Sequence, residues 1–370
     1  MSFKEILAGF DLAKLKDAVY GATEHDVHRV LSKGKFCVDD FPVLVSPAAA
    51  PHLERMAAMS KQITRLRFGQ VMRLYAPLYV SNECVNACRY CGFNVHNQLA
   101  RVTLNRDEVF READAIHRQG FRHLLLVSGE APNKVNTTYL ADIVYELSRT
   151  FSGISIEIYP MDLEQYRSLA AAGVTGIAIY QETYDRAIYK TLHAGPKADY
   201  DYRLAAIERA GEVGFRDLGI GALMGLTDFR VDMTCVTLHA AYLMKQFWKS
   251  QISISFPRIR AAAGAYLPPH LVSDKELAQT VFALRMVLPD ADLVLSTRER
   301  AAFRDGMAAV GITRMSAGSR TNPGGYSLEE DSLEQFQIAD DRTPAEVSAM
   351  LVEKNLEPVW KDFDRSFLFE

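Results

Sequence analysis

Three of the five cysteines in this sequence lie within eight positions, and their spacing can bring three sulfur atoms to one point. Cys84, Cys88 and Cys91 form a C-x3-C-x2-C pattern in the stretch SNECVNACRYCGFNVHN, residues 81–97. One disulfide would use two of these thiols and leave the third over, so the spacing favours a metal centre. A four-iron cluster is normally held by four thiolates, and three thiolates leave one iron open to an outside ligand. We favour this interpretation.

A structural zinc ion is the alternative for the same cysteines. Such a site usually has four protein ligands, and Cys37 and Cys235 each stand alone elsewhere in the sequence. His96 is the one imidazole near the motif, so a Cys3His zinc site in a non-enzymatic scaffold or binding protein stays open. We expect Cys37 and Cys235 to be small buried hydrophobic residues.

The cysteine spacing resembles that of the radical S-adenosylmethionine (SAM) superfamily. An aromatic residue, Tyr90, precedes the last cysteine, and the motif follows the apolar, strand-like run VMRLYAPLYVS at residues 71–81. The resemblance implies a [4Fe-4S] cluster on Cys84, Cys88 and Cys91. It also implies that the amino and carboxylate groups of SAM chelate the open iron.

Strand-like runs alternate with amphipathic helical stretches after residue 70. The eight runs lie at residues 71–81, 123–130, 154–160, 176–183, 217–226, 251–259, 292–299 and 312–319. Helical stretches such as residues 106–120 and 273–289 separate them. Eight strands alternating with helices over about 250 residues predict an α/β fold, a (β/α)8 TIM-type barrel. The alternative, an open doubly wound sheet, lacks a G-x-G-x-x-G turn after the first strand.

We expect three segments along the chain. Residues 1–70 have helical periodicity and form an N-terminal helical extension, and residues 71–320 form the barrel. Residues 321–370, with a helix expected at residues 343–355, form a C-terminal extension packed on the barrel.

Polar residues close several of the strand-like runs. Active sites of (β/α)8 barrels lie at the carboxyl ends of the strands. The first run leads into the cysteines, and four others end in the polar segments 128–130, 181–183, 296–299 and 316–319. Their convergence on one face predicts the active site there.

Charge and composition exclude two classes of partner. In 370 residues, Lys+Arg 42 against Asp+Glu 46 gives a net charge of −4 and no basic excess for nucleic acid. No apolar run approaches the roughly 20 residues of a membrane span, and the N-terminus has no secretory pattern. We expect a cytoplasmic enzyme acting on a small molecule, in a reducing compartment that suits five unlinked cysteines.

Motifs along nearly the whole chain resemble one family of the superfamily. In order, they are CRYCGFN, HLLLVSGEAPNKV, YQETY, GIGALMGL, SISFPRIR, LSTRE, SAGSRTNPGGY, EQF and PVWKD. The series is similar to the 2-iminoacetate synthase (ThiH) family, the tyrosine lyases of thiamine thiazole biosynthesis. The resemblance implies a radical SAM carbon–carbon lyase that cleaves the Cα–Cβ bond of L-tyrosine to 2-iminoacetate (dehydroglycine) and p-cresol, with methionine and 5′-deoxyadenosine formed from SAM. It also implies thiazole synthase as a partner and a low-potential electron donor such as flavodoxin or ferredoxin.

The same resemblance assigns residues to SAM. Glu182 and Arg203 are expected at its ribose and carboxylate, although a plain surface ion pair is the alternative for them. Tyr90 and the apolar GIGALMGL run are expected beside the adenine. Gly129 is expected to let backbone carbonyls approach the ammonium group, because a side chain there would hold them off. Glu130 follows at the same strand end and is expected to be a cofactor-binding residue as well.

Ser296 and Arg298 are the candidates for binding substrate. Residues two apart on a strand share a face, so the two side chains point the same way. A buried arginine at a barrel mouth needs an anion, and a carboxylate fits its planar fork bidentately. We therefore expect this pair to bind the tyrosine carboxylate.

The sequence departs from the family pattern at two places. Tyr159-Pro160 ends the third run where Gln-Pro is expected, and Ala261 stands where a proline is expected. Tyr159 is therefore a candidate for contact with the substrate phenol. A related radical SAM lyase with another amino-acid substrate stays an alternative.

Hydrogenase-maturation tyrosine lyases are the nearest rival family. They begin with the same cleavage but need further cysteines for a second iron–sulfur cluster in a C-terminal extension. No cysteine follows Cys235, and the chain stops at PVWKDFDRSFLFE, which favours the 2-iminoacetate synthase family.

Overall fold

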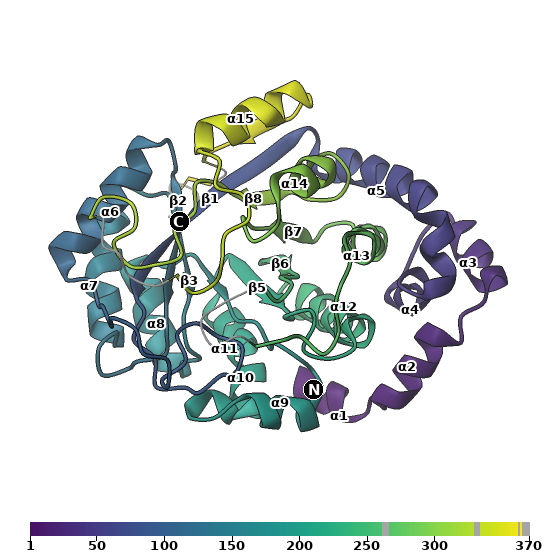
Figure 1. The fold of residues 1–370 in the computed structure, drawn as a ribbon, viewed down its shortest axis with the longest axis horizontal. Coiled ribbons are helices and arrows are strands. Elements are labelled where there is room, and N and C mark those ends of the chain that lie inside the picture. The colour runs from purple at the N-terminus through teal and green to yellow at the C-terminus, as the bar shows by residue number, and fades with distance from the viewer. Residues whose placement is uncertain (261–265, 329–333, 362, 365–370) are drawn as a thin grey trace.

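A closed barrel of eight parallel strands lies at the centre of the computed structural model, which describes residues 1–260, 266–328, 334–361 and 363–364 (Figure 1). The strands are β1 (Val71–Ser81), β2 (His123–Ser128), β3 (Gly153–Glu157), β4 (Gly176–Ala178), β5 (Asp217–Gly221), β6 (Gln251–Ser255), β7 (Asp292–Leu295) and β8 (Arg314–Ser316). They follow one another around the barrel in sequence order. β1 closes it by pairing with both β2 and β8. The predicted (β/α)8 barrel is confirmed.

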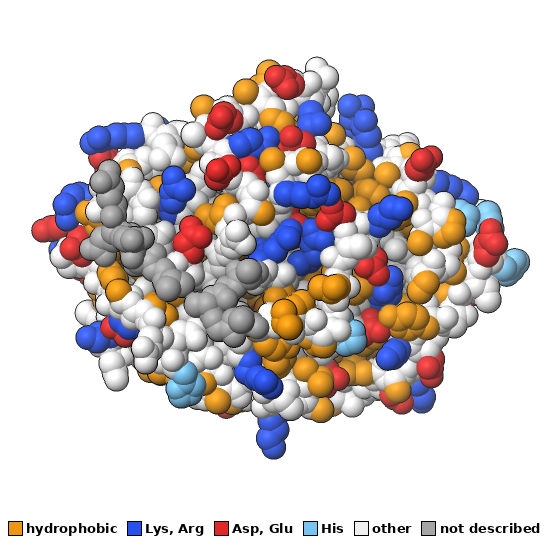
Figure 2. All heavy atoms as spheres, viewed as in Figure 1, with side chains coloured by type: hydrophobic (Ala, Val, Ile, Leu, Met, Phe, Trp, Pro, Cys, Tyr) orange, Lys and Arg blue, Asp and Glu red, His pale blue; other side chains and the backbone are white. Residues whose placement is uncertain are grey.

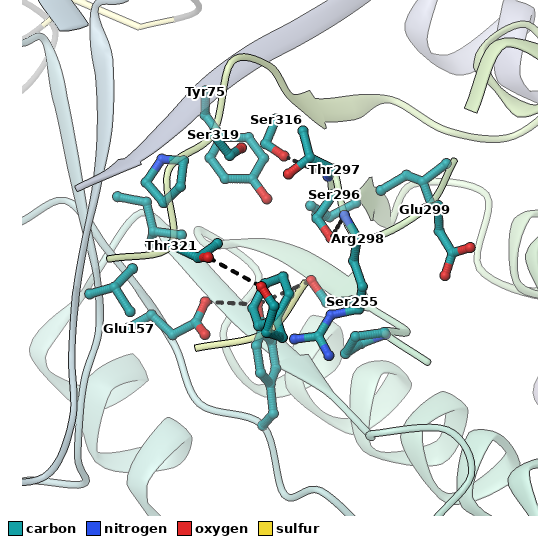
Figure 3. Close-up of a pocket in the computed structure, with 18 of the residues that line it drawn as sticks. Tyr75, Glu157, Ser255, Ser296, Thr297, Arg298, Glu299, Ser316, Ser319 and Thr321 are labelled. Atoms are coloured by element: carbon teal, nitrogen blue, oxygen red, sulfur yellow. Dashed lines mark hydrogen bonds between the residues drawn. The ribbon is translucent and has the colours of Figure 1, made fainter. Parts of the chain in front are cut away.

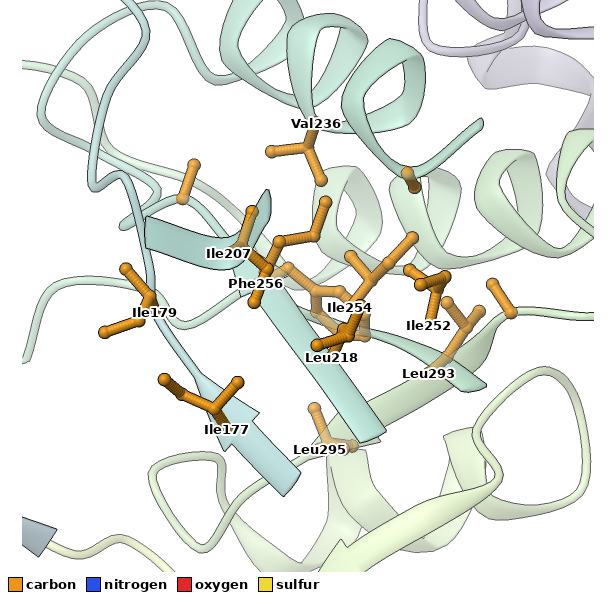
Figure 4. Close-up of a cluster of buried hydrophobic side chains, with 14 of the residues drawn as sticks. Ile177, Ile179, Ile207, Leu218, Val236, Ile252, Ile254, Phe256, Leu293 and Leu295 are labelled. Atoms are coloured by element: carbon orange, nitrogen blue, oxygen red, sulfur yellow. The ribbon is translucent and has the colours of Figure 1, made fainter. Parts of the chain in front are cut away.

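The strands form where aliphatic and β-branched residues are concentrated. β5 and β7 are buried at every position, because one face meets the barrel interior and the other meets the surrounding helices. Figure 4 shows part of the layer between strands and helices, in which Leu218, Ile252 and Ile254 lie in one buried cluster with Val236 of α12.

Helices surround the barrel. They are α6 (Arg106–Arg118), α7 (Thr137–Leu147), α8 (Leu163–Ala172), α9 (Arg186–Leu192), η3 (Pro196–Ala198), α10 (Tyr200–Leu204), α11 (Ala206–Val213), α12 (Phe229–Gln246), α13 (Asp274–Val287) and α14 (Ala301–Ala308). Asn105 and Ser273 begin α6 and α13 with complete capping boxes, which fix those two starts where the sequence predicts them. No helix among the described residues combines the length and the apolar character that a membrane span requires.

Every predicted run after the first is longer than the strand that forms, by two to five residues at its carboxyl end. At these positions the chain leaves the regular ladder and builds the barrel mouth. Isolated bridges between Glu182 and Ala222 and between Met224 and Arg258 continue the pairing for single residues. Glu182 has a φ of 70°, a left-handed conformation that a non-glycine residue adopts at an energetic cost.

The first 70 residues form the expected helical segment along one side of the barrel, purple and dark blue in Figure 1. Its elements are α1 (Phe3–Ala8), α2 (Leu12–Tyr20), α3 (Glu24–Leu31), η1 (Val38–Asp40), α4 (Phe41–Leu44), η2 (Pro47–His52) and α5 (Leu53–Phe68). α5 packs against α13, and α2 and α4 pack against α12. The Phe3 ring also stacks on His239 of α12 with 3.9 Å between ring centroids.

The two isolated cysteines differ in environment. Cys235 in α12 is fully buried, as predicted. The predicted burial of Cys37 is wrong, because this residue is exposed in the connection before η1. There its backbone N–H donates to the Asp40 carboxylate at 3.0 Å.

The chain after β8 contacts both ends of the barrel. α15 (Pro344–Glu353), expected at residues 343–355, leads to β9 (Glu357–Val359), which pairs with the start of β1 and which the alternation did not predict. Near the barrel mouth, the N–H groups of Ala339 and Asp340 donate to the Thr297 carbonyl at 3.0 and 3.1 Å. Ala261, one of the two departures from the family pattern, lies outside the described residues.

Candidate active site

The cysteine-bearing loop leaves β1 at the carboxyl end of the barrel and is fixed by its own hydrogen bonds. The Arg101 guanidinium donates to the carbonyls of Asn82, Phe93 and Asn94 at 2.8, 2.9 and 2.7 Å. The Asn94 side-chain amide donates to the Cys88 carbonyl at 2.9 Å. A cation that gathers carbonyls from both ends of the loop holds it in one conformation.

The three cysteines lie together in a mostly apolar setting. Cys88 is buried, and the partly buried Cys84 and Cys91 pack against Tyr79 and Val127. Burial raises the pKa of Cys91 and raises that of Cys88 to about 12. These thiols therefore become thiolates only with a cationic group to bind them, and an iron–sulfur cluster is such a group.

The spacing of the sulfur atoms argues against a single zinc ion. A tetrahedral zinc ion with bonds of about 2.3 Å holds its sulfur ligands roughly 3.8 Å apart. The sulfurs of Cys84, Cys88 and Cys91 do not all lie within 4.8 Å of one another. One zinc ion could therefore not bind all three sulfurs in the positions that they occupy here.

The imidazole beside this loop is His193, not His96, whose side chain is exposed. The His193 Nδ1–H donates to the Tyr189 carbonyl at 2.8 Å, and Nε2 accepts the Tyr90 hydroxyl at 2.7 Å. Burial lowers the pKa of His193 to about 3, so the ring is neutral with both nitrogens in use. Neither histidine offers a nitrogen to the cysteines, which argues against the Cys3His zinc site.

Glu182 lies at the centre of a buried charged group near the cysteine loop. Its carboxylate accepts Lys197 Nζ at 2.7 Å and lies 3.7 Å from the Arg203 guanidinium. Burial alone would raise the pKa of Glu182, but Lys197 and Arg203 together hold it below its ordinary value. The Arg203 Nε also donates to the Tyr180 carbonyl at 2.8 Å. The expected Glu182–Arg203 pair is therefore present and buried rather than on the surface, and Lys197 is a member that the sequence did not predict.

Tyr90 faces an apolar group beside these charges. Leu223 and Leu226 of the GIGALMGL run, with Leu192, pack together, and the Tyr90 ring lies against them. The Lys197 ammonium lies 5.7 Å from the centre of the Tyr90 ring. The structure thus brings together the two features expected to flank an adenine.

Gly129 and Glu130, at the end of β2, contact the cysteine loop. A Cβ at Gly129 would lie 2.3 Å from the Glu83 carbonyl oxygen and 3.0 Å from Cys84 Cβ. The Glu130 carboxylate accepts the Asn86 amide at 2.7 Å. The structure therefore gives these two residues a role in holding the loop, which is a different physical reason for the glycine from the one expected.

A cavity lies at the mouth of the barrel, between the ends of β1, β3, β6, β7 and β8. The space between its lining side chains amounts to about 700 Å³, part of which is open to solvent. Figure 2 shows Lys and Arg side chains gathered near the centre of this face. The predicted residues Ser296 and Arg298 both line the cavity, with Ser316 and Ser319 from the end of β8 (Figure 3).

Arg298 points into this cavity (Figure 3). Its guanidinium lies 3.5 Å from the centre of the Phe336 ring and donates to the Arg258 carbonyl at 3.3 Å. Its Nε is buried without a hydrogen-bond partner among the described residues. Burial lowers the pKa of Arg298, so an anion that binds the guanidinium would relieve the cost of burying its charge.

Glu157 is a second charged group in the cavity, and the sequence analysis did not single it out. It is the last residue of β3 and accepts a hydrogen bond from the Tyr180 hydroxyl at 3.1 Å. Burial raises the pKa of Glu157 to about 7. The alternation in Ile154-Ser155-Ile156-Glu157 is the signal that indicates an inward carboxyl, because the two isoleucines are in the outer core.

The cavity and the cysteine loop share a wall. Tyr79 and Val127 line the cavity and also pack against Cys84 and Cys91. A group bound on the cysteines and a small molecule bound beside Arg298 would therefore be neighbours.

A TIM-type barrel with a three-cysteine loop after its first strand, beside a cavity at the carboxyl ends of the strands, defines a radical SAM enzyme. The family model of the Radical SAM superfamily matches residues 78–234, and that of the Biotin and Thiamin Synthesis associated domain matches residues 255–357. Enzymes of this class use a [4Fe-4S] cluster and SAM, and these are the cofactors of this chain.

The chain belongs to the 2-iminoacetate synthase family. It is 42% identical to 2-iminoacetate synthase of Salmonella typhimurium over 94% of this chain and 92% of that protein. It is 40% identical to 2-iminoacetate synthase of Escherichia coli over 98% of this chain and 97% of that protein. The structure of the FeFe-hydrogenase maturase HydG from Carboxydothermus hydrogenoformans matches with a TM-score of 0.89 and 31% identity, over 97% of this chain and 85% of that one. The chain is a radical SAM lyase.

Proposed function

We propose that this enzyme cleaves the Cα–Cβ bond of L-tyrosine to 2-iminoacetate and p-cresol, for the thiazole of thiamine. One observation carries the proposal beyond family membership. A partly buried guanidinium, that of Arg298, points into a cavity whose wall is shared with the cysteine loop. An amino-acid carboxylate bound there lies next to the cofactor site.

Arg298 and Ser296 bind the substrate carboxylate in this proposal. Among the described residues Arg298 has no carboxylate partner. Its guanidinium instead lies against the face of the Phe336 ring. A carboxylate can take two parallel hydrogen bonds from one guanidinium. The Ser296 hydroxyl lies in the same cavity and accepts the Arg298 backbone N–H at 3.4 Å, which ties the serine to the arginine.

Cys84, Cys88 and Cys91 would hold the [4Fe-4S] cluster and leave one iron for SAM. When bound, the cluster and SAM would supply the radical chemistry that starts the cleavage of the substrate. Glu182 accepts hydrogen bonds from the ribose hydroxyls of SAM. It does so with the carboxylate oxygen that is not paired with Lys197.

The remaining SAM contacts in this proposal come from three residues near the loop. Arg203 pairs with the SAM carboxylate, and Tyr90 lies against the adenine. Gly129 and Glu130 keep the cysteine loop in place at the end of β2.

The family resemblance implies two protein partners. A low-potential donor such as flavodoxin or ferredoxin reduces the cluster. Thiazole synthase receives 2-iminoacetate, because an imine hydrolyses in water and is best passed on directly. We place these partners, and the enzyme, in the cytoplasm.

The test is anaerobic reconstitution of the chain with iron and sulfide, then incubation with SAM, a reductant and L-tyrosine. The expected products are p-cresol, 5′-deoxyadenosine, and glyoxylate from hydrolysed 2-iminoacetate. Carbon monoxide is assayed in parallel, because the similar structure includes a hydrogenase maturase. Formation of carbon monoxide, or turnover only of another amino acid, would overturn the proposal.

A further inference from the structure

Tyr159, at the departure from the family pattern, is not placed to contact a substrate phenol. Its side chain is buried in the main hydrophobic core, and its hydroxyl donates to the Val135 carbonyl at 2.7 Å. It does not line the cavity that holds Arg298. Another residue must recognise the substrate hydroxyl.

Glu157, two residues earlier, lines that cavity. Since side chains alternate along a strand, Glu157 points inward while Ile156 and Ile158 belong to the core. The Tyr180 hydroxyl donates to Glu157 Oε2 and lies 3.2 Å from the Ser255 hydroxyl. This network orients the carboxyl and leaves its other oxygen, Oε1, without a hydrogen bond among the described residues (Figure 3).

Glu157 and Arg298 are opposite charges in one cavity, yet they form no ion pair within 4.0 Å among the described residues. A ligand that uses both must have an anion at one point and a hydrogen-bond donor at a distance from it. In tyrosine the α-amino group adjoins the carboxylate, whereas the phenolic hydroxyl lies at the opposite end of the molecule. Glu157 ends β3 and Arg298 follows β7, so the two groups come from separate walls of the cavity, and the phenolic hydroxyl is the tyrosine donor that lies far from the carboxylate.

We propose that Glu157 accepts a hydrogen bond from the phenolic hydroxyl of the substrate and so selects tyrosine over phenylalanine. This inference rests on the proposed function, because it takes tyrosine as the substrate. A phenylalanine in the same position would leave Oε1 of this partly buried carboxylate without a donor. Sites built to pair with a hydroxyl reject the analogue that lacks it for this reason.

The ionisation of Glu157 adds a pH dependence. Burial raises the pKa of Glu157 to about 7, with Glu182 raising it and Arg298 and Arg203 lowering it. Tyr75 and Tyr79 on β1 and Tyr180 after β4 also face it. The ionised form is the better acceptor, so selectivity for tyrosine should increase as the pH rises through about 7.

The test compares Glu157→Leu and Glu157→Gln with a matched control, Tyr159→Phe. Binding of tyrosine and of phenylalanine to the reconstituted enzyme with SAM is measured by equilibrium dialysis, and kcat/KM is measured for tyrosine. Glu157→Leu should weaken tyrosine binding by roughly 100-fold while phenylalanine binding stays within a few-fold. Glu157→Gln keeps an acceptor oxygen, so its affinity for tyrosine should lie between those of the wild type and Glu157→Leu. Its selectivity for tyrosine should no longer depend on pH. Tyr159→Phe should leave the ratio of tyrosine affinity to phenylalanine affinity unchanged.

Three results separate the possible failures. An equal loss for both amino acids would assign Glu157 to the amino group and overturn the inference. An unchanged ratio in Glu157→Leu, at normal iron content and circular dichroism, would also overturn it. Failure of the proposed function itself appears separately, as a wild-type enzyme that cleaves SAM but releases no p-cresol.

Discussion

The cysteine-loop side of the barrel mouth and the cavity beside β7 treat buried charge in opposite ways. Near the loop, Glu182 is paired with Lys197 at 2.7 Å and has Arg203 at 3.7 Å. In the cavity, Glu157 and Arg298 lie on separate walls, and neither forms an ion pair with a described residue. Both regions lie at the carboxyl ends of strands of one barrel.

The difference reflects what each region binds. Burying an ion costs several kcal/mol unless it is paired. Paired charges make a framework that is complete without a ligand, so the site keeps its shape while SAM binds and its products leave. Unpaired charges reduce stability and keep their interactions for a substrate that enters and leaves, as is common at functional sites. Four experiments test this contrast.

The largest effect is expected from the cysteines themselves. Replacing Cys84, Cys88 or Cys91 with alanine should abolish the cluster and all SAM cleavage, since two thiolates do not hold a four-iron cluster. Cys37→Ala and Cys235→Ala should keep both. Iron and sulfide analysis with anaerobic assays measures this, and loss of the cluster in Cys235→Ala would show that a fourth cysteine takes part.

Arg298→Ala should separate the two regions functionally. Tyrosine turnover should fall by about 10²–10³ in kcat/KM, the usual loss for one partner of a buried charged contact, while slow SAM cleavage without tyrosine persists. The exposed Arg300, which pairs with Asp274, is the matched control as Arg300→Ala. Loss of SAM binding in Arg298→Ala, measured by equilibrium dialysis, would place Arg298 on the cofactor side.

Gly129→Ala tests whether the cysteine loop is held by close packing. The added methyl would lie 2.3 Å from the Glu83 carbonyl oxygen, so the loop must shift at a cost of about 1–3 kcal/mol. Iron bound per chain should fall, and urea should release the cluster at a lower concentration. Gly306→Ala, where a Cβ meets nothing within 4 Å, should keep a normal cluster. Full iron occupancy in Gly129→Ala would contradict the packing argument.

Glu157→Gln tests the cost of the unpaired carboxyl. The folded-state pKa is raised from 4.5 to about 7, so ionisation destabilises the fold increasingly as the pH rises between these values. The glutamine variant should therefore gain stability over the parent at pH 8 and lose that gain near pH 5. The gain is at most about 3 kcal/mol, and less where water in the cavity screens the charge. Urea midpoints at the two pH values measure it, with the exposed Glu353→Gln as a control that should show no such change. An equal effect at both values would mean that the carboxyl is not buried as a charge.

The strand order and the cysteine motif could be predicted from the sequence because both are local. Apolar runs separated by amphipathic stretches predicted all eight barrel strands, and β1 has the predicted bounds, Val71–Ser81. The C-x3-C-x2-C spacing predicted a cluster, since three thiols within eight residues must share one loop. The polar strand ends likewise predicted that Ser296 and Arg298 would face a common mouth, because residues two apart on a strand share a side.

Only the tertiary structure decided which charges meet. Lys197 is fifteen residues from Glu182, and Glu157 is far in sequence from Arg298, so no local period links either pair. The barrel joins the first pair in one buried group and holds the second apart across a cavity. It also turns the Tyr159 hydroxyl to the Val135 carbonyl and leaves Glu157 facing inward. The pairing of a charge depends on distances of a few ångströms in three dimensions, and these are fixed when the barrel closes.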